Sequence, residues 1–331
     1  MIFDNISRTG WKRTGIVFSV VIALSATIAT LIVLASSARI GTGADKEKAV
    51  RSLERMREKY VAVKSVHLVA DVKLTLYGSD FRTGSGTFEY WAEGERYKIK
   101  SRTDKHLGLK SDSDAAYDGK RYYFLDPKLK VLSYQQKDVP KTFAALPNPL
   151  FLPVDYLSDE DDDCVLCAPR LSDFKTENVR VSNRIKSLLV KSEQRDQNTG
   201  ELVRDIEMPG GKTNNQAIHL ALRMLEVNEE RVRPLHIKRI TPDGKVISSL
   251  SFADFTRNAL GDFPRAITVR AFDEKGDLAL LAEFIVRTLE VNEPLASNTF
   301  TISFDEAESV WDSDGRTFVK EKGAASPRPK N

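Results

Sequence analysis

Two cysteines are the residues whose type and spacing most readily suggest chemistry. Cys164 and Cys167 form a Cys-x-x-Cys pair, which can hold zinc, exchange a disulfide or form a local structural disulfide. A zinc site usually needs two further Cys or His ligands, and the four histidines of the chain show no paired spacing. A thioredoxin-type pair would begin a helix in a β-α-β unit, which the surrounding pattern lacks. We expect a structural disulfide, with a redox pair and a metal site as the alternatives.

The other candidate reactive groups give weaker signals. Asp159 to Asp163 could attract calcium, but the run lacks the alternating Asp-x-Asp-x-Asp-Gly pattern, so we interpret it as a solvated loop. The chain contains no Gly-x-Ser-x-Gly elbow, no His-Glu-x-x-His helix and no evident nucleophile beside a base. We therefore predict that the protein is not an enzyme and that it uses no cofactor or metal.

Composition narrows the classes of partner. The 331 residues include 50 Lys and Arg against 47 Asp and Glu, and a net charge of +3 argues against dedicated nucleic-acid binding. A hydrophobic fraction of 41% is ordinary and argues against a protein with many membrane spans. The length allows one large β domain or two small ones.

The N-terminus carries an export signal. Ile16 to Ala35 holds no charge and is about 20 residues long, which is enough to cross a bilayer, and three basic residues precede it. We predict a cytoplasmic segment over residues 1–15 and a transmembrane anchor over 16–38, or alternatively a signal peptide cut near Ser36 to Ala38. Under either interpretation, we expect the residues that follow this segment to be exported across the membrane. The protein would face the periplasm from the cell envelope, anchored to the inner membrane, or be secreted to the periplasm if the segment is cleaved.

The elements that follow are one helix and a series of strands. Val50, Leu53, Met56 and Tyr60 recur at helical spacing after a capping pattern that begins at Thr42, which predicts an amphipathic helix. Strict alternation predicts a long strand over 66–76. Aromatic, β-branched and turn residues predict further strands in hairpins over 88–99, 117–134, 235–252 and 267–288.

The fold class expected from this pattern is mainly β. Short connections favour an antiparallel meander, and roughly ten strands must curl, since flat open sheets of that width are unusual. The apolar, proline-broken segment 141–157 cannot be a central strand and would cover the concave face together with the helix. We place this domain at residues 45–310 and a disordered tail at 320–331.

Several short motifs resemble the LolA/LolB superfamily of periplasmic lipoprotein carriers. The resemblance covers residues 49–157 and, more loosely, 235–304. In order along the chain, the motifs are Gly86-Thr87-Phe88-Glu89-Tyr90-Trp91, Gly94-x-Arg96-Tyr97, Asp118-Gly119-Lys120, Asp126-Pro127, the apolar run Asn148 to Leu152, and Phe252 to Asn258 followed by a strand led by Pro264.

The resemblance implies an unclosed β-barrel that binds acyl chains of lipids or lipoproteins beneath a helical lid. The side chains expected to form the cavity wall are Leu68, Leu74, Phe88, Tyr90, Tyr97, Tyr122 and Phe124. Those expected to form the lid are Phe143, Leu146, Leu150 and Phe151. The predicted function is binding of a hydrophobic ligand as a carrier or sensor. The alternative is an anchored scaffold with a filled core that presents surfaces to an envelope protein partner.

Overall fold

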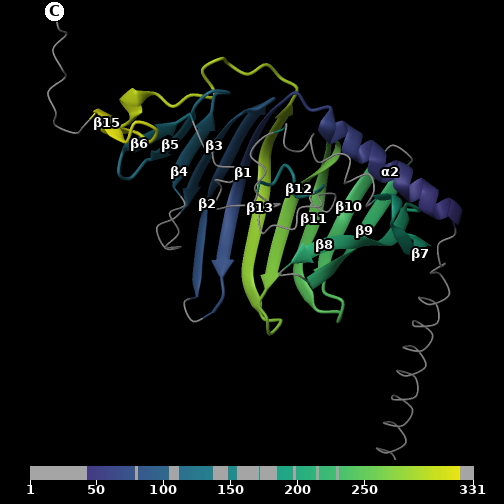
Figure 1. Ribbon diagram of the computed structural model, residues 1–331. Coiled ribbons are helices and arrows are strands. Elements are labelled where there is room, and N and C mark those ends of the chain that lie inside the picture. Colours follow the sequence, from purple (N-terminus) through teal and green to yellow (C-terminus); the bar gives the residue numbers. More distant parts are fainter. Residues whose placement is uncertain are drawn as a thin grey trace, which may run out of the picture.

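A computed structural model describes residues 43–78, 81–103, 112–136, 148–154, 171, 185–196, 199–213, 216–228 and 231–320. The elements in chain order (Figure 1) are α2 (Gly43–Val61), β1 (Ser65–Leu76), β2 (Arg82–Glu93), β3 (Arg96–Thr103), β4 (Ser113–Tyr117), β5 (Tyr122–Asp126), β6 (Val131–Gln135), β7 (Leu189–Arg195), β8 (Leu202–Thr213), β9 (Gln216–Asn228), β10 (Arg231–Ile240), β11 (Val246–Asn258), β12 (Gly261–Phe272), β13 (Leu278–Val291), the 3-10 helix η4 (Phe304–Glu306), β14 (Ser309–Asp312) and β15 (Thr317–Lys320).

The strands form one unclosed sheet with two meanders that meet at its centre. The order of the fifteen strands that the structure describes is β15-β14-β6-β5-β4-β3-β2-β1-β13-β12-β11-β10-β9-β8-β7. Strands β1 to β6 run outward through successive neighbours on one side, and β13 back to β7 does so on the other. β1 and β13 join the halves in antiparallel register, from Val66 opposite Val291 to Leu76 opposite Leu280.

The predicted helix and the predicted turns are confirmed. Leu53, Met56 and Tyr60 are buried on one side of α2, as their spacing requires. Asp118 closes the turn between β4 and β5 by accepting hydrogen bonds from the backbone N–H groups of Lys120 (2.8 Å) and Arg121 (2.7 Å). These local signals depend only on neighbours in sequence, so the sequence alone could reveal them.

The predicted fold class, a mainly β and unclosed antiparallel sheet, is confirmed in outline, but the strand count was wrong and one pairing is parallel. We expected about ten strands, whereas the described residues form fifteen, including β7, β8 and β9, which were not assigned from the sequence. β14 and β15 follow the last strand expected from the sequence, and β14 pairs with β6 in parallel, with Val310 opposite Leu132. Each of these two strands has four residues, which is too short for alternation to be recognised.

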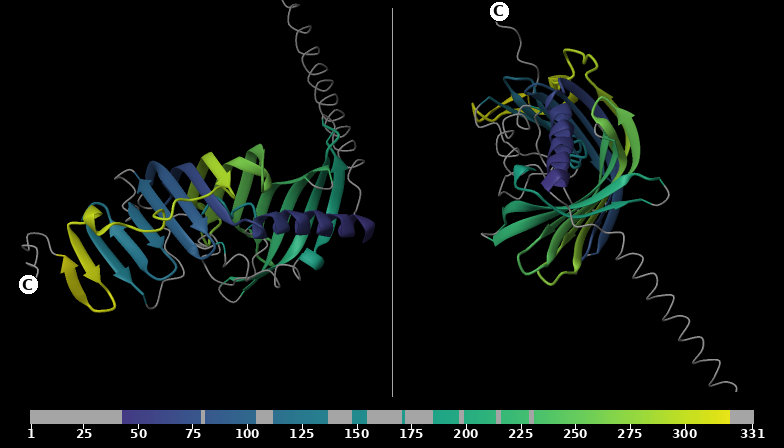
Figure 2. Two further views of the ribbon diagram at one scale, coloured as in Figure 1. Left: turned by 90° about the horizontal axis from the view of Figure 1, so that it is seen from above. Right: turned by 90° about the vertical axis from the view of Figure 1, so that its right-hand side faces the viewer.

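The sheet curves around α2, and its two faces bury different apolar groups. Figure 2 shows α2 inside the curve. The main cluster occupies this concave face and includes side chains of α2, of most strands and of residues 148–154. A second cluster lies on the opposite face of β4, β5 and β6, beneath the C-terminal segment, and consists of Ala116, Tyr123, Leu125, Leu132, Ile302, Ala307 and Val310.

The predictions made for the two ends of the chain concern residues that lie outside the described ranges. The predicted anchor or signal over 16–38 and the tail beyond residue 320 lie outside the described residues. Within the described ranges, no helix has both the length and the apolar character needed to cross a bilayer.

Candidate functional site

The predicted wall residues come together on the concave face. Strand alternation places Leu68 and Leu74 of β1 on the same face as the aromatic side chains of β2, β3 and β5. Six of the seven predicted side chains belong to the main cluster and are only 0–5% exposed. Phe124 is partly buried against the same cluster. The structure therefore groups these residues on one apolar surface, which the protein's own side chains cover.

Two of the four predicted lid residues are part of that cover. Leu150 and Phe151 lie in a run of turns over residues 148–154 and are buried in the main cluster, as are Leu152 and Val154. The Phe151 ring meets the Tyr90 ring edge to face, with 6.3 Å between the ring centroids. The other two predicted lid residues, Phe143 and Leu146, lie outside the described residues, as does the predicted disulfide of Cys164 and Cys167.

A few polar groups lie within this apolar surface. Burial raises the pKa of the Tyr122 phenol, and the nearby Tyr97 adds to this effect, so Tyr122 is neutral at physiological pH. Asn148 is buried, and its Oδ1 atom accepts a hydrogen bond from the Leu150 backbone N–H (3.1 Å). The Asn148 Nδ2 atom is buried without a hydrogen-bond partner in the described part of the chain. Such a surface can hold an apolar molecule and orient a polar end of it.

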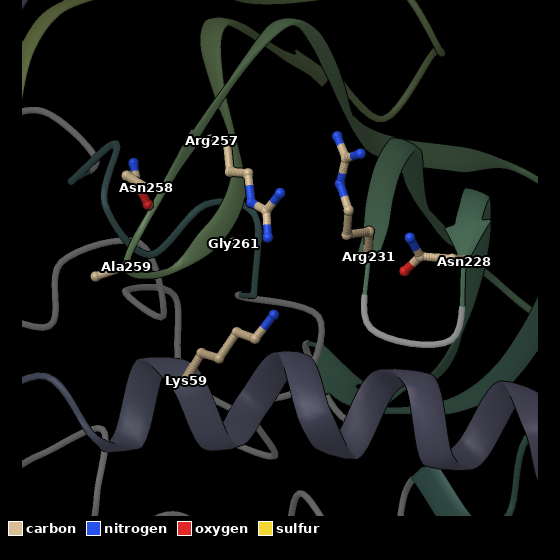
Figure 3. Close-up of a pocket in the computed structure, with 7 residues that line it drawn as sticks. All are labelled: Lys59, Asn228, Arg231, Arg257, Asn258, Ala259 and Gly261. Atoms are coloured by element: carbon tan, nitrogen blue, oxygen red, sulfur yellow. The ribbon is translucent and has the colours of Figure 1, made fainter.

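A second hollow, which the sequence analysis missed, lies beside the end of α2. A pocket of about 270 Å³ is lined by Lys59, Asn228, Arg231, Arg257, Asn258, Ala259 and Gly261. Figure 3 shows it between the last turns of α2, the adjoining ends of β9 and β10, and the turn from β11 to β12, with the Lys59 and Arg257 side chains directed toward its centre. Three of the seven lining residues are cationic and none is acidic. Its charge sets it apart from the neighbouring apolar surface.

Asp262 fixes one side of this pocket. Its side chain is 1% exposed and accepts hydrogen bonds from two arginines: Arg231 Nη2 (2.9 Å to Oδ2, 3.1 Å to Oδ1) and Arg233 Nε (2.6 Å to Oδ2). Burial opposes ionisation of the carboxyl group, but the hydrogen bonds from Arg231 and Arg233 outweigh it and lower the pKa of Asp262. Asp262 is therefore a carboxylate at neutral pH, and it holds Arg231 in place.

Comparisons with known proteins found similar solved structures but no matching family. No protein-family model matches the sequence, and no curated protein matches it. Among solved structures, a domain described as an outer membrane lipoprotein-sorting protein from Vibrio parahaemolyticus shows 10% identity and a TM-score of 0.43, over 77% of this chain and 97% of that chain. A LolA superfamily protein from Nitrosomonas europaea shows 11% identity and a TM-score of 0.40, over 77% and 97%.

A DUF1329 family protein from Desulfovibrio piger ATCC 29098 shows 11% identity and a TM-score of 0.45, over 77% of this chain and 96% of that chain. The structural neighbours thus include LolA-superfamily proteins, the group that the sequence motifs resemble. All three TM-scores lie below 0.5 and all three identities are 10–11%, so neither the fold nor the ligands of those proteins are carried over to this chain.

Proposed function

We propose that this protein binds the acyl chains of a lipid or lipoprotein on the concave face of its sheet, as a non-enzymatic carrier or sensor exposed in the cell envelope. The observation that carries the proposal is the way in which this face is covered. Among the described residues, the apolar sheet face is covered by α2, by the run of turns over residues 148–154 and by Leu171, Ile185 and Leu188, and aromatic rings meet at the contact of the turns with β2.

The turns over 148–154 are suited to exchange. Their described backbone hydrogen bonds are internal, from Phe151 N to the Asn148 carbonyl (3.1 Å) and from Val154 N to the Phe151 carbonyl (2.9 Å). Within the described part of the chain, the segment contacts the sheet through apolar side chains. An acyl chain that displaced these side chains would bury its own methylenes at about 0.8 kcal/mol each, and this gain offsets the exposure of the displaced side chains. A ligand that binds the open form better shifts the protein toward it.

The scaffold alternative has one observation in its favour. Six of the seven predicted wall side chains are already 0–5% exposed, so the protein's own residues fill the face in this state. A scaffold would keep this packing permanently and present its outer surface to a partner protein. The two functions therefore differ in whether residues 148–154 leave the sheet.

Ligand extraction and uptake test the proposal directly. The purified protein should release lipid or acyl species on solvent extraction, detected by mass spectrometry, and should take up a fluorescent fatty acid with a saturable signal. A protein that carries no lipid and takes up no fatty acid would contradict ligand binding and favour the scaffold.

Phe151→Ala tests whether the turns act as a lid. Removing the ring that contacts Tyr90 should speed fatty-acid uptake, because less apolar contact holds the segment closed. Phe284→Ala is the matched control, because Phe284 is fully buried in the same cluster but lies in β13 of the sheet. Both variants should lose stability. Equal uptake rates in the two variants would show that residues 148–154 are ordinary core.

A further inference from the structure

We propose that the basic pocket beside α2 binds a phosphate ester, and that in the intact protein this group is the headgroup phosphate of an acidic lipid. The second part rests on the proposed function, since it places the acyl chains of the same molecule on the concave face. The first part concerns the pocket alone.

The pocket gathers positive charge from distant parts of the chain. Lys59 comes from the last turn of α2, Arg231 from the start of β10, and Arg257 from the end of β11. Figure 3 shows the Lys59 ammonium group and the Arg257 guanidinium group approaching the same space from opposite sides. Arg257 is exposed and forms no ion pair with any residue in the described part of the chain. It is therefore available to an anion.

The carboxylate of Asp262, which lies beside Arg231, is already engaged. Asp262 directs both carboxylate oxygens to Arg231 and Arg233, so four cationic side chains stand in or beside the pocket around one carboxylate. Glu229 and Glu230, which connect β9 to β10, lie outside the described residues. Within the described part the local charge is positive, which attracts an anion.

Size and geometry favour phosphate over a smaller anion. The volume of about 270 Å³ leaves room for a group larger than a lone carboxylate. Arginine guanidinium groups match phosphate oxygens through paired N–H donors, and lysine adds a compact charge. Lys59 and Arg257 face the hollow from two sides and suit an oxyanion with several acceptor atoms, while Arg231, whose Nε and Nη2 atoms donate to Asp262, adds positive charge beside them.

The backbone at Gly261 makes this arrangement possible. Gly261 has a φ of +96°, which residues with a side chain rarely adopt. A Cβ atom there would also lie 3.3 Å from the Lys59 ammonium nitrogen. Glycine thus lets the hairpin end turn tightly while Lys59 reaches across it into the pocket.

The pocket adjoins the main cluster directly. Tyr60, next to Lys59, is buried in that cluster, as are Leu260 and Phe263 on either side of Gly261 and Asp262. A lipid whose phosphate lay between the cations of the pocket would therefore have its acyl chains start at the edge of the apolar surface. This continuity is the reason for assigning the phosphate to a lipid.

Titration calorimetry with three soluble compounds tests the site. The purified full-length protein is titrated with glycerol 3-phosphate, with dihexanoyl phosphatidic acid and with dihexanoyl phosphatidylcholine. Arg257→Gln and Lys59→Gln should each weaken binding of glycerol 3-phosphate by about tenfold, and added salt should weaken it in the wild type. Lys275→Gln is the matched control, because Lys275 is exposed beyond the far end of β12, and it should bind as the wild type does.

The outcomes separate the pocket from the concave face. No binding of glycerol 3-phosphate, or equal binding by Arg257→Gln and the wild type, overturns the phosphate site, whatever the fluorescent fatty acid shows. Phosphatidic acid that binds more tightly than both glycerol 3-phosphate and phosphatidylcholine supports the acidic lipid as the source. If phosphatidic acid binds only as tightly as glycerol 3-phosphate, the lipid source is overturned in favour of a free phosphate ester. If phosphatidic acid binds only as tightly as phosphatidylcholine, the preference for an acidic headgroup is overturned. A Glu229→Gln/Glu230→Gln variant should bind glycerol 3-phosphate at least as well as the wild type, and a loss would contradict an anion pocket.

Discussion

The main cluster and the second cluster bury opposite faces of the same strands, and they differ in how they are covered. Tyr122 of β5 points into the main cluster, while its neighbour Tyr123 points into the second. The second cluster lies under a C-terminal segment that is hydrogen-bonded into the sheet through β14, and the Ser313 N–H also donates to the Tyr134 carbonyl (3.0 Å). Residues 148–154 cover the main cluster with backbone hydrogen bonds that, as far as described, are internal.

This difference suggests different roles for the two covers. A cover that is part of the ladder can leave only by breaking several backbone hydrogen bonds, which leaves polar groups unpaired. A cover held by apolar side chains can be replaced by another apolar surface. We therefore assign ligand exchange to the main cluster and a structural role to the second.

The largest expected effect comes from Phe88→Ala in the main cluster. Phe88 of β2 is fully buried in the main cluster, and removing its ring leaves a cavity among the surrounding apolar side chains. The free energy of unfolding should fall by about 3–5 kcal/mol, measured by urea denaturation. Fatty-acid uptake should also change, because the side chain belongs to the proposed ligand surface. A loss below about 1 kcal/mol would show that this face is loosely packed.

Leu132→Ala makes the corresponding change in the second cluster. Leu132 is fully buried opposite Leu125 of β5 and Val310 of β14. Its truncation should lower the free energy of unfolding by about 2–4 kcal/mol, because it leaves a cavity among buried apolar groups. Fatty-acid uptake by the folded variant should equal that of the wild type. Lost uptake in a folded Leu132→Ala protein would break the division of roles between the clusters.

Asp262→Asn should destabilise the protein in a pH-dependent way. The folded pKa of Asp262 lies below its usual value of 3.8, so its stabilising effect is complete above about pH 4 and is lost as the pH falls through the lower folded value. At pH 7 the free energy of unfolding of the variant should be about 2–3 kcal/mol lower, because Arg231 and Arg233 no longer donate hydrogen bonds to a charged carboxylate.

Urea denaturation of the wild type and of Asp262→Asn at several pH values checks this expectation. The difference between the two proteins should narrow as the pH falls below about 4, where the wild-type carboxyl group begins to protonate. A difference that stays constant down to strongly acidic pH would show that the ion pairs with Arg231 and Arg233 contribute little to stability.

The part of this structure that the sequence could predict is the local part. Helical spacing from Val50 to Tyr60 and the alternation from Val66 to Leu74 each show which face of one element is buried. Apolar patterns of this kind reveal that a face is covered but not what covers it. The seven wall residues could therefore be grouped in advance, whereas the filling of that face by the chain itself could not.

Contacts between residues far apart in the chain could not be predicted from the sequence for a different reason. The basic pocket combines Lys59 with Arg231 and Arg257, residues that share no motif and meet only because β1 pairs with β13 and the strands meander back toward α2. The parallel pairing of β14 with β6 likewise joins segments far apart in sequence. In both cases the signal lies in the topology of the sheet and not in any short run of residues.

Ser303→Ala should have the smallest effect and should sharpen the contrast between the covers. The Ser303 hydroxyl accepts a hydrogen bond from the Asp305 N–H (3.2 Å), and the Glu306 carboxylate accepts one from the Ser303 N–H (3.1 Å), which closes a capping box at η4. Losing the hydroxyl should cost about 0.5–1 kcal/mol, and Ser303→Thr should retain most of the bond. Because β14 still ties the segment to β6, amide hydrogen exchange should rise only around residues 303–310. An equal rise in α2 or β1 would mean that the two clusters open together, and the proposed division between a fixed and an exchangeable cover would fail.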